Sequence, residues 1–159
     1  EIEVGDWSSD VCSSDLSLFR SCNRGQQQHL WCERCPKCLF VYLILAPFIE
    51  EKILTTAIFQ HNLLDQKENY SHLVSLLGLT DSKPFECVGS VAESQVAFYL
   101  TYQKYQRANH RVPLLINQLA KKILPLHDDW ETFCSQIINN YGQHNLPTWA
   151  EELVKKTQK

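Results

Sequence analysis

The most apolar part of the chain is the run LFVYLILAPFI, from Leu39 to Ile49. Apolar side chains fall on nearly every face of a helix over residues 39–60, which is typical of a buried helix. Pro47 lacks a backbone N–H and should therefore kink or divide this helix. A bilayer span needs about 20 consecutive apolar residues, so this interrupted run is too short to cross a membrane.

Two further patterns follow, and each has a recognisable helix end. Residues 66–77 predict a helix that Gly78 closes, because glycine readily adopts the left-handed conformation of a helix C-terminus. Ser90 and Glu93 form an S-x-x-E capping box, which predicts the start of another helix.

The last third of the chain contains two more amphipathic patterns after a polar joint at residues 107–111. The first has apolar residues at helical spacing and ends before a proline; its apolar residues are Leu115, Leu119 and Ile123. The second is predicted to start at Asp128, with Glu131 completing its cap. No strand pattern or repeat is visible, so the sequence predicts a mainly α fold, a helical bundle.

Residues 1–16 fit none of these patterns. The stretch DWSSDVCSSDL, residues 6–16, resembles the in-frame translation of a widely used short-read sequencing adapter, and residues 1–5 fit the bases around it. We interpret residues 1–16 as a non-native, disordered segment that contributes nothing to the fold. The join implies that a preceding part of the natural protein is missing, so we expect the tail of a longer protein.

The charge of the chain excludes some classes of partner. The 159 residues include 15 Lys+Arg and 18 Asp+Glu, and removing the five acidic residues of segment 1–16 changes the net charge from −3 to +2. Neither value indicates a nucleic-acid-binding surface or an acidic tail. The remaining length suits about one small domain. We divide it into a cysteine-rich segment at 17–38, a helical region at 39–106 and C-terminal helices at 107–159.

Four cysteines crowd into CNRGQQQHLWCERCPKC, with the spacing C-x9-C-x2-C-x2-C. Zinc prefers four sulfur or nitrogen ligands in a tetrahedron, and a C-x-x-C turn directs two thiolates at one point. We therefore predict a structural zinc knuckle, and its ligands are Cys22, Cys32, Cys35 and Cys38. An iron–sulfur cluster uses the same thiolates and stays open as an alternative, and His29 could replace one of them. Four thiolates leave no coordination position for a substrate.

The surroundings of these cysteines agree with a metal in a reducing compartment. Gly25 lets the loop after the first cysteine bend tightly, and nearby cations would offset the thiolate charge; they are Arg24, Arg34 and Lys37. No secretory signal is visible, and tight cysteine spacing without one indicates a metal site rather than disulfides, hence a cytoplasmic protein. Cys134 stands apart on an apolar helix face and is predicted to be an inert buried thiol.

Two segments together carry a family resemblance. They are LFRSCNRG…LWCERCPKCLFVYLILAPFI, within residues 18–49, and KPFECVG, residues 83–89, with IFQHNLL between them at 58–64. Over about residues 18–100 this combination resembles the C-terminal part of the UDP-N-acetylmuramoyl-L-alanyl-L-glutamate epimerase family. The cysteine pattern alone is also similar to 7-cyano-7-deazaguanine synthase, an ATP-using enzyme of the PP-loop class. The segments KCLFVYLILAPF and KPFECVG favour the epimerase.

The resemblance implies the C-terminal part of a larger α/β ATP-using enzyme, an isomerase of cell-wall peptidoglycan synthesis. Such an enzyme inverts the terminal L-glutamate of a UDP-linked muramoyl dipeptide, with ATP and magnesium as cofactors. After residue 16 the chain has four widely separated glycines and no glycine-rich phosphate loop. In the PP-loop class the nucleotide site precedes the cysteine segment. We therefore expect this chain to need a missing N-terminal domain and to be inactive alone, and the resemblance assigns no residue of this chain as the catalytic base.

The KPFECVG loop precedes the helix predicted at Ser90. A helix N-terminus attracts anions through its unpaired N–H groups and its dipole. We predict that Lys83 binds a substrate carboxylate or phosphate and that Glu86 and Cys87 belong to the same substrate site, where either is a candidate for the base. The alternative is a surface turn in which Phe85 packs and Glu86 favours the helix dipole. Both interpretations stay open.

A synthase acting on a nucleobase and a zinc-stabilised binding module for RNA are the rival functions. An RNA-binding module should have clustered basic residues interleaved with exposed aromatic side chains. Here Phe40, Tyr42 and Phe48 fall within an apolar run, and a net charge of +2 is small. We therefore predict no nucleic-acid partner.

Overall fold

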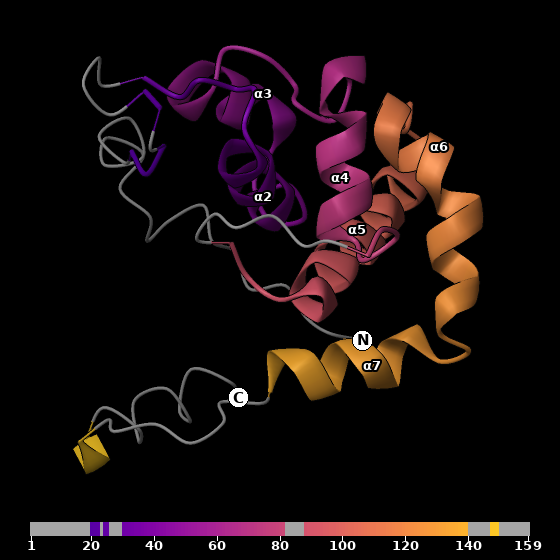
Figure 1. Cartoon of the computed structure of the whole chain (residues 1–159). Helices are drawn as coiled ribbons and strands as arrows, with labels where there is room; N and C mark the ends of the chain where they lie inside the picture. Colours follow the sequence, from indigo (N-terminus) through magenta and orange to yellow (C-terminus); the bar gives the residue numbers. More distant parts are fainter. Residues whose placement is uncertain (1–19, 23, 26–29, 82–87, 140–146, 150–159) are drawn as a thin grey trace.

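The computed structural model describes residues 20–22, 24–25, 30–81, 88–139 and 147–149 (Figure 1). The adapter-like segment 1–16 lies outside these ranges. Within them the chain forms helices and turns and no strand, which confirms the predicted mainly α fold. The elements are α2 (Pro36–Leu45), α3 (Glu51–Ile53), the π-helix η2 (Leu54–Ile58), the 3-10 turn η3 (Lys67–Asn69), α4 (Tyr70–Leu76), α5 (Val91–Arg107), α6 (Leu114–Ile123), the 3-10 turn η4 (Leu124–Leu126) and α7 (Trp130–Ile138).

The apolar run of residues 39–60 is divided at Pro47, as predicted. α2 ends at Leu45, and the turn that contains Pro47 separates it from the next helical residue, Glu51. α2 also begins before the apolar run, with Pro36 in its first turn, where a missing N–H costs nothing. The second piece widens into η2, whose last hydrogen bond runs from the N–H of Phe59 to the carbonyl of Leu54 at 2.8 Å.

The break at Pro47 is stabilised by a side chain from another helix. The Nζ of Lys104, on α5, donates to the carbonyl oxygens of Ala46 and Ile49 at 2.8 and 2.7 Å. An interrupted helix leaves such carbonyls without partners within the helix, and a buried unpaired carbonyl is costly. Burial lowers the pKa of Lys104, and the nearby carboxylates of Glu50 and Glu51 oppose this effect. Lys104 therefore ties α5 to the end of α2.

Gly78 closes α4, as predicted. Its φ of 73° is left-handed. The N–H of Gly78 donates to the carbonyl of Ser75 at 3.2 Å, and the N–H of Leu79 donates to that of Val74 at 3.0 Å. This pair of bonds is a Schellman motif, which satisfies carbonyls at the helix end. α4 is shorter than the predicted helix because the preceding turn, η3, is 3-10.

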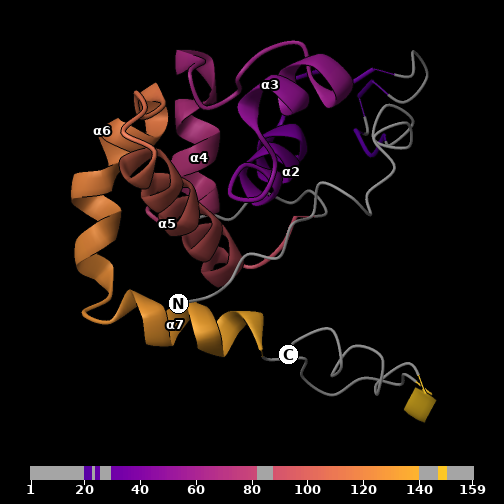
Figure 2. The same cartoon turned by 180° about the vertical axis from the view of Figure 1, so that it is seen from behind.

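α5 is the central helix of the bundle. The Ser90 Oγ accepts from the N–H of Glu93 at 3.1 Å and the Glu93 carboxylate accepts from the N–H of Ser90, so the predicted capping box is formed. α5 packs against α2, α6 and α7, and α2 also packs against α4. Figures 1 and 2 show α5 between the α2–α4 side and α6, with α7 across the bottom of the bundle. The fully buried side chains of this core include Leu39, Tyr42, Leu43, Leu73, Phe98 and Leu115.

α6 is the amphipathic helix that its spacing predicts, because Leu115, Leu119 and Ile123 are each 0% exposed. Its start is fixed by Asp65, whose carboxylate accepts from the N–H of Leu114 at 2.7 Å and forms an ion pair with Arg111. None of the described helices combines the length and the apolar character that a membrane span requires.

The predicted cap of α7 is wrong by one residue. The helix is capped by Asp129, whose carboxylate accepts from the N–H of Thr132 at 2.9 Å, and not by Asp128 with Glu131. Both aspartates suit a helix start by composition. The register is set instead by Trp130, which is 7% exposed and stacks on Tyr99 of α5 with ring centroids 4.7 Å apart. Cys134 on α7 is 2% exposed, so it is the buried thiol that was predicted.

Gly78→Ala should destabilise the chain. A Cβ at this position would lie 2.7 Å from Cγ1 of Val91, and the left-handed conformation costs an ordinary residue about 1–2 kcal/mol. We expect the free energy of unfolding in urea to fall by at least this amount. Gly78→Asn is the matched control, because asparagine tolerates this conformation better and should lose less. An alanine variant as stable as the original chain would contradict the assignment.

Candidate metal centre

The four cysteines that the sequence singles out lie together in the structure. The sulfurs of Cys22, Cys32, Cys35 and Cys38 are all within 4.8 Å of one another. The Sγ atoms of Cys35 and Cys38 are 3.3 Å apart, and those of Cys32 and Cys38 are 3.7 Å apart. Four sulfurs bonded to one zinc at ~2.3 Å would lie about 3.8 Å apart in a tetrahedron. The cluster therefore has the donor set and nearly the dimensions needed to hold a metal ion.

The cluster is closed to solvent on most sides. Cys22 is 2% exposed, Cys35 and Cys38 are 0% exposed, and only Cys32 is partly accessible. Three of the cysteines are part of the apolar core, together with Trp31, and Cys32 packs against it. Four sulfur donors complete a tetrahedral coordination sphere and leave no position for a substrate. An ion held here would stabilise the fold and would not take part in the chemistry.

The C-x-x-C turn places two sulfurs at the start of α2. Cys35 is the N-cap residue, and its Sγ accepts from the N–H of Cys38 at 3.4 Å. In the preceding C-x-x-C turn, between Cys32 and Cys35, Glu33 adopts a left-handed φ of 57°, which reverses the chain direction. A helix N-terminus carries partial positive charge, so it favours thiolates at both Cys35 and Cys38.

Cys22 reaches the cluster from the other arm of a loop that Gly25 makes possible. Its Sγ accepts from the N–H of Gly25 at 3.3 Å and from that of Cys32 at 3.5 Å. The N–H of Leu30 donates to the carbonyl of Gly25 at 3.1 Å. A Cβ at residue 25 would overlap the carbonyl oxygen of Leu30. This close approach of two backbones explains the glycine that the sequence placed here.

The pKa values of the thiols reflect both crowding and hydrogen bonding. Burial acts to raise the pKa of Cys22, but hydrogen bonds from the N–H groups of Cys32 and Gly25, together with those from the Cys32 and Cys38 thiols, lower it. Burial raises the pKa of Cys32 to about 11. The hydrogen bond with the Cys35 thiol, and then burial, raise the pKa of Cys38. These thiols resist losing their protons together unless a nearby cation compensates the charge.

Two buried polar residues that sequence patterns do not single out join the cysteine segment to the rest of the fold. The carboxylate of Glu33, which is 8% exposed, accepts from the N–H of Gln60 at 2.5 Å and pairs with Nδ1 of His61 at 2.7 Å. The Glu33 carbonyl accepts from Nδ2 of Asn69 at 3.3 Å, and the same Nδ2 donates to the carbonyl of Leu63 at 3.2 Å. These partners are 27 to 36 residues away from Glu33, so no local pattern reveals them.

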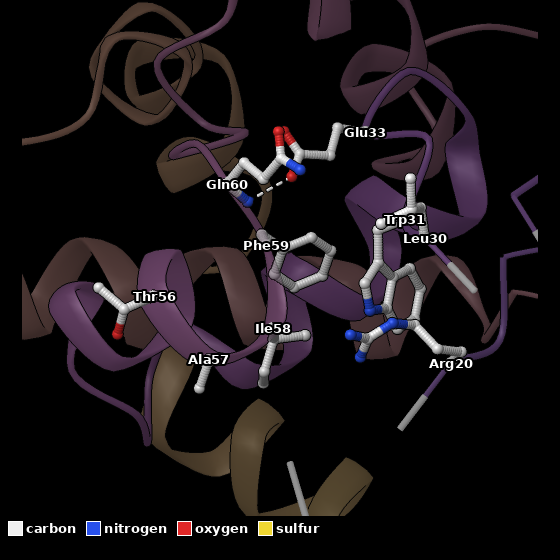
Figure 3. Close-up of a pocket in the computed structure, with 9 residues that line it drawn as sticks. All are labelled: Arg20, Leu30, Trp31, Glu33, Thr56, Ala57, Ile58, Phe59 and Gln60. Atoms are coloured by element: carbon white, nitrogen blue, oxygen red, sulfur yellow. Dashed lines mark hydrogen bonds between the residues drawn. The ribbon is translucent and has the colours of Figure 1, made fainter. Parts of the chain in front are cut away.

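A pocket opens beside the cysteine segment (Figure 3). Trp31 and Phe59 form part of its wall, with ring centroids 5.0 Å apart. Arg20 also lines the pocket, and Figure 3 shows the carboxylate of Glu33 turned toward Gln60. The pocket therefore combines an apolar wall with one cationic and one anionic group. The remaining lining residues are Leu30, Thr56, Ala57 and Ile58.

The predicted substrate-binding residues are not placed by the structure. Lys83, Glu86 and Cys87 lie outside the described residues, as does His29, the alternative metal ligand. The chain after this loop is described from Val88, and Gly89 lies against α2: a Cβ there would come within 2.5 Å of Cζ of Phe40.

Comparison with known proteins places the chain in a family. The family model described as the MurL C-terminal domain matches residues 18–131, which extends the resemblance well past residue 100. A UDP-N-acetyl-alpha-D-muramoyl-L-alanyl-L-glutamate epimerase from Xanthomonas oryzae pv. oryzae is 34% identical over 143 residues, covering 86% of this chain and 31% of that protein. A protein of the same name from Salinispora tropica is 45% identical over 91 residues, covering 57% of this chain and 19% of that protein.

A third relative with this name, from a Micromonospora species, is 38% identical over 97 residues, covering 61% of this chain and 21% of that protein. The chain thus spans less than a third of the length of the curated relatives it matches. No solved structure matches it. The family model covers most of the chain, including all four clustered cysteines, so the chain belongs to the MurL C-terminal domain family.

Proposed function

We propose that Cys22, Cys32, Cys35 and Cys38 bind one structural zinc ion. The observation that supports this is the gathering of the four sulfurs within 4.8 Å of one another. Thiolate ligands must lose their protons, and a divalent cation supplies the charge that makes this favourable. The zinc would tie the Cys22 arm to the start of α2, and its binding free energy would act as folding free energy for that arm.

Metal analysis of the chain purified under reducing conditions should find one zinc per chain. Cys35→Ser should lose this zinc, because it removes the sulfur that caps α2. Cys134→Ser is the matched control, since its buried thiol lies on α7 and outside the cluster. If the analysis finds iron and acid-labile sulfide, the site is an iron–sulfur cluster and not a zinc site. A chain that contains no metal would contradict the proposal.

We propose that the chain is the C-terminal part of an ATP-dependent epimerase. Its substrate would be UDP-N-acetylmuramoyl-L-alanyl-L-glutamate, a cell-wall precursor, and the terminal L-glutamate would be inverted. The support is that all three relatives reported above are named UDP-N-acetyl-alpha-D-muramoyl-L-alanyl-L-glutamate epimerase. A UDP-linked precursor and a reduced cysteine site both agree with a cytoplasmic location.

The chemistry gives ATP a specific purpose. The α-hydrogen beside a free carboxylate is hard to remove, because the resulting carbanion lies next to an existing negative charge. Adenylation of that carboxylate by ATP, with Mg²⁺ bound to the phosphates, removes the charge and makes the carbonyl an electron acceptor. A general base can then take the α-proton, and return of a proton to the other face inverts the centre. Adenylation releases pyrophosphate, and hydrolysis of the adenylate by water then restores the carboxylate and releases AMP.

In this proposal the chain supplies only a part of the enzyme. The sequence after residue 16 has no glycine-rich phosphate loop, so nucleotide binding would depend on the rest of the protein. Lys83, Glu86 and Cys87 remain the proposed substrate-binding residues, because their segment precedes the N-cap of α5 in the sequence. Lys83 would contribute the positive charge that an anionic substrate requires.

Activity should require the full-length protein. We expect the full-length protein to invert the glutamate and to release AMP from ATP when the UDP-linked dipeptide is present. The chain alone should release no AMP, although it should bind zinc. Chiral analysis of the glutamate and AMP quantification provide the measurements. Full-length protein that consumes ATP with a nucleobase substrate and not with the dipeptide would favour the synthase function instead.

A further inference from the structure

The pairing of Glu33 with His61 has the geometry of a carboxylate that orients an imidazole. The Oε2 of Glu33 is 2.7 Å from Nδ1 of His61. An ionised carboxylate can only accept hydrogen bonds, so Nδ1 carries the proton in the neutral ring and Nε2 is the acceptor. The Glu33 side chain is 10% exposed, whereas that of His61 is 65% exposed. The carboxylate is thus held inside the protein while the imidazole is open to solvent.

Glu33 is held in place at both its carboxylate and its backbone. The N–H of Gln60 donates to Oε1 at 2.5 Å, which leaves Oε2 for the imidazole. The backbone of Glu33 is held by the hydrogen bond from Asn69 and by the adjacent cysteine cluster. Because both its backbone and its carboxylate are constrained, Glu33 can set the orientation of the His61 ring.

The Glu33–His61 pair adjoins the pocket described above through its carboxylate. Glu33 and Gln60 both line this pocket, and His61 follows Gln60 directly in the chain. Arg20, another lining residue, provides a guanidinium that can pair with a carboxylate (Figure 3). The imidazole is thus hydrogen-bonded to one residue of the pocket wall and directly follows another in the chain.

We propose that His61 is a proton-transfer residue of the epimerase and that Glu33 is its positioning residue, an inference that rests on the proposed function. The α-C–H bond of the adenylated glutamyl residue breaks, and its electron pair moves into the activated carbonyl group to form an enolate. The proton moves to Nε2 of His61, and Glu33 stabilises the imidazolium. The adenylate comes from ATP, and the proton for the opposite face comes from a second acid on that face, exchangeable with water.

The test uses the full-length protein with His61→Gln and His61→Asn. Asparagine keeps an N–H donor near the position of Nδ1, so it can still bond to Glu33, but it lacks Nε2. Both variants should lose epimerisation, and deuterium uptake at the α-carbon in deuterium oxide, by about 10²–10⁴-fold, the usual contribution of a general base. ATP–pyrophosphate exchange, which reports adenylation, should stay within about threefold of the original protein. The matched control is His110→Gln, because His110 is an exposed histidine in the turn after α5.

The outcomes separate the inference from the function on which it rests. If the original protein epimerises the dipeptide and either His61 variant keeps its rate, the proton-transfer role is wrong and the proposed function stands. Loss of zinc or of folding in both variants would show a structural role and would also overturn the inference. If the original protein shows neither adenylation nor epimerisation, both proposals fail.

Discussion

The convergence of four cysteine sulfurs at the N-terminus of α2 is the constraint on which the surrounding structure depends. The segment from Arg20 to Cys35 contains only short turns among its described residues, so it has little regular hydrogen bonding to hold its shape. Its order comes from the sulfurs, the backbone N–H groups that point at them, and the close approach at Gly25. Losing the sulfur cluster would leave this arm with few local reasons to stay folded.

α2 transmits this constraint to the rest of the bundle. It packs against α4 and α5, and Lys104 of α5 bonds to the carbonyls at its interrupted end. The other helices have their own terminators, such as the Schellman motif at Gly78 and the capping box at Ser90. The bundle therefore has local sources of stability that do not involve the cysteines, whereas the arm before α2 depends on them.

The cysteine cluster, which has a structural role, is also distinct from the groups that could take part in chemistry. A closed set of four sulfurs has no position for a substrate, so a chemical role must belong to neighbouring groups. The same turn that holds two of the cysteines also carries Glu33, which reaches out of the cluster to Gln60 and His61. Where the cysteine segment meets η2, the structure thus offers a pocket, a cation and an oriented imidazole.

The sequence by itself determined the features that depend on neighbouring residues. The division at Pro47, the left-handed Gly78, the capping box at Ser90 and the apolar face of α6 all follow from backbone geometry within one or two helical turns. The four-cysteine spacing likewise indicated one cluster, because short C-x-x-C turns direct their sulfurs together. The start of α7 was misplaced by one residue, since adjacent aspartates have the same local preference.

Only the tertiary structure decided which distant groups meet. Lys104 reaches carbonyls 55 and 58 residues away, and Glu33 binds partners 27 and 28 residues away. From the neighbouring residues in the sequence, each of these side chains would be expected to be an ordinary charged residue at the surface. Their burial and their partners arise from how whole helices pack, and packing energy depends on the complementary shape of surfaces that are far apart along the chain. For this reason periodicity and spacing alone could predict the helices and the cysteine cluster, but not the pairing of Glu33 with His61.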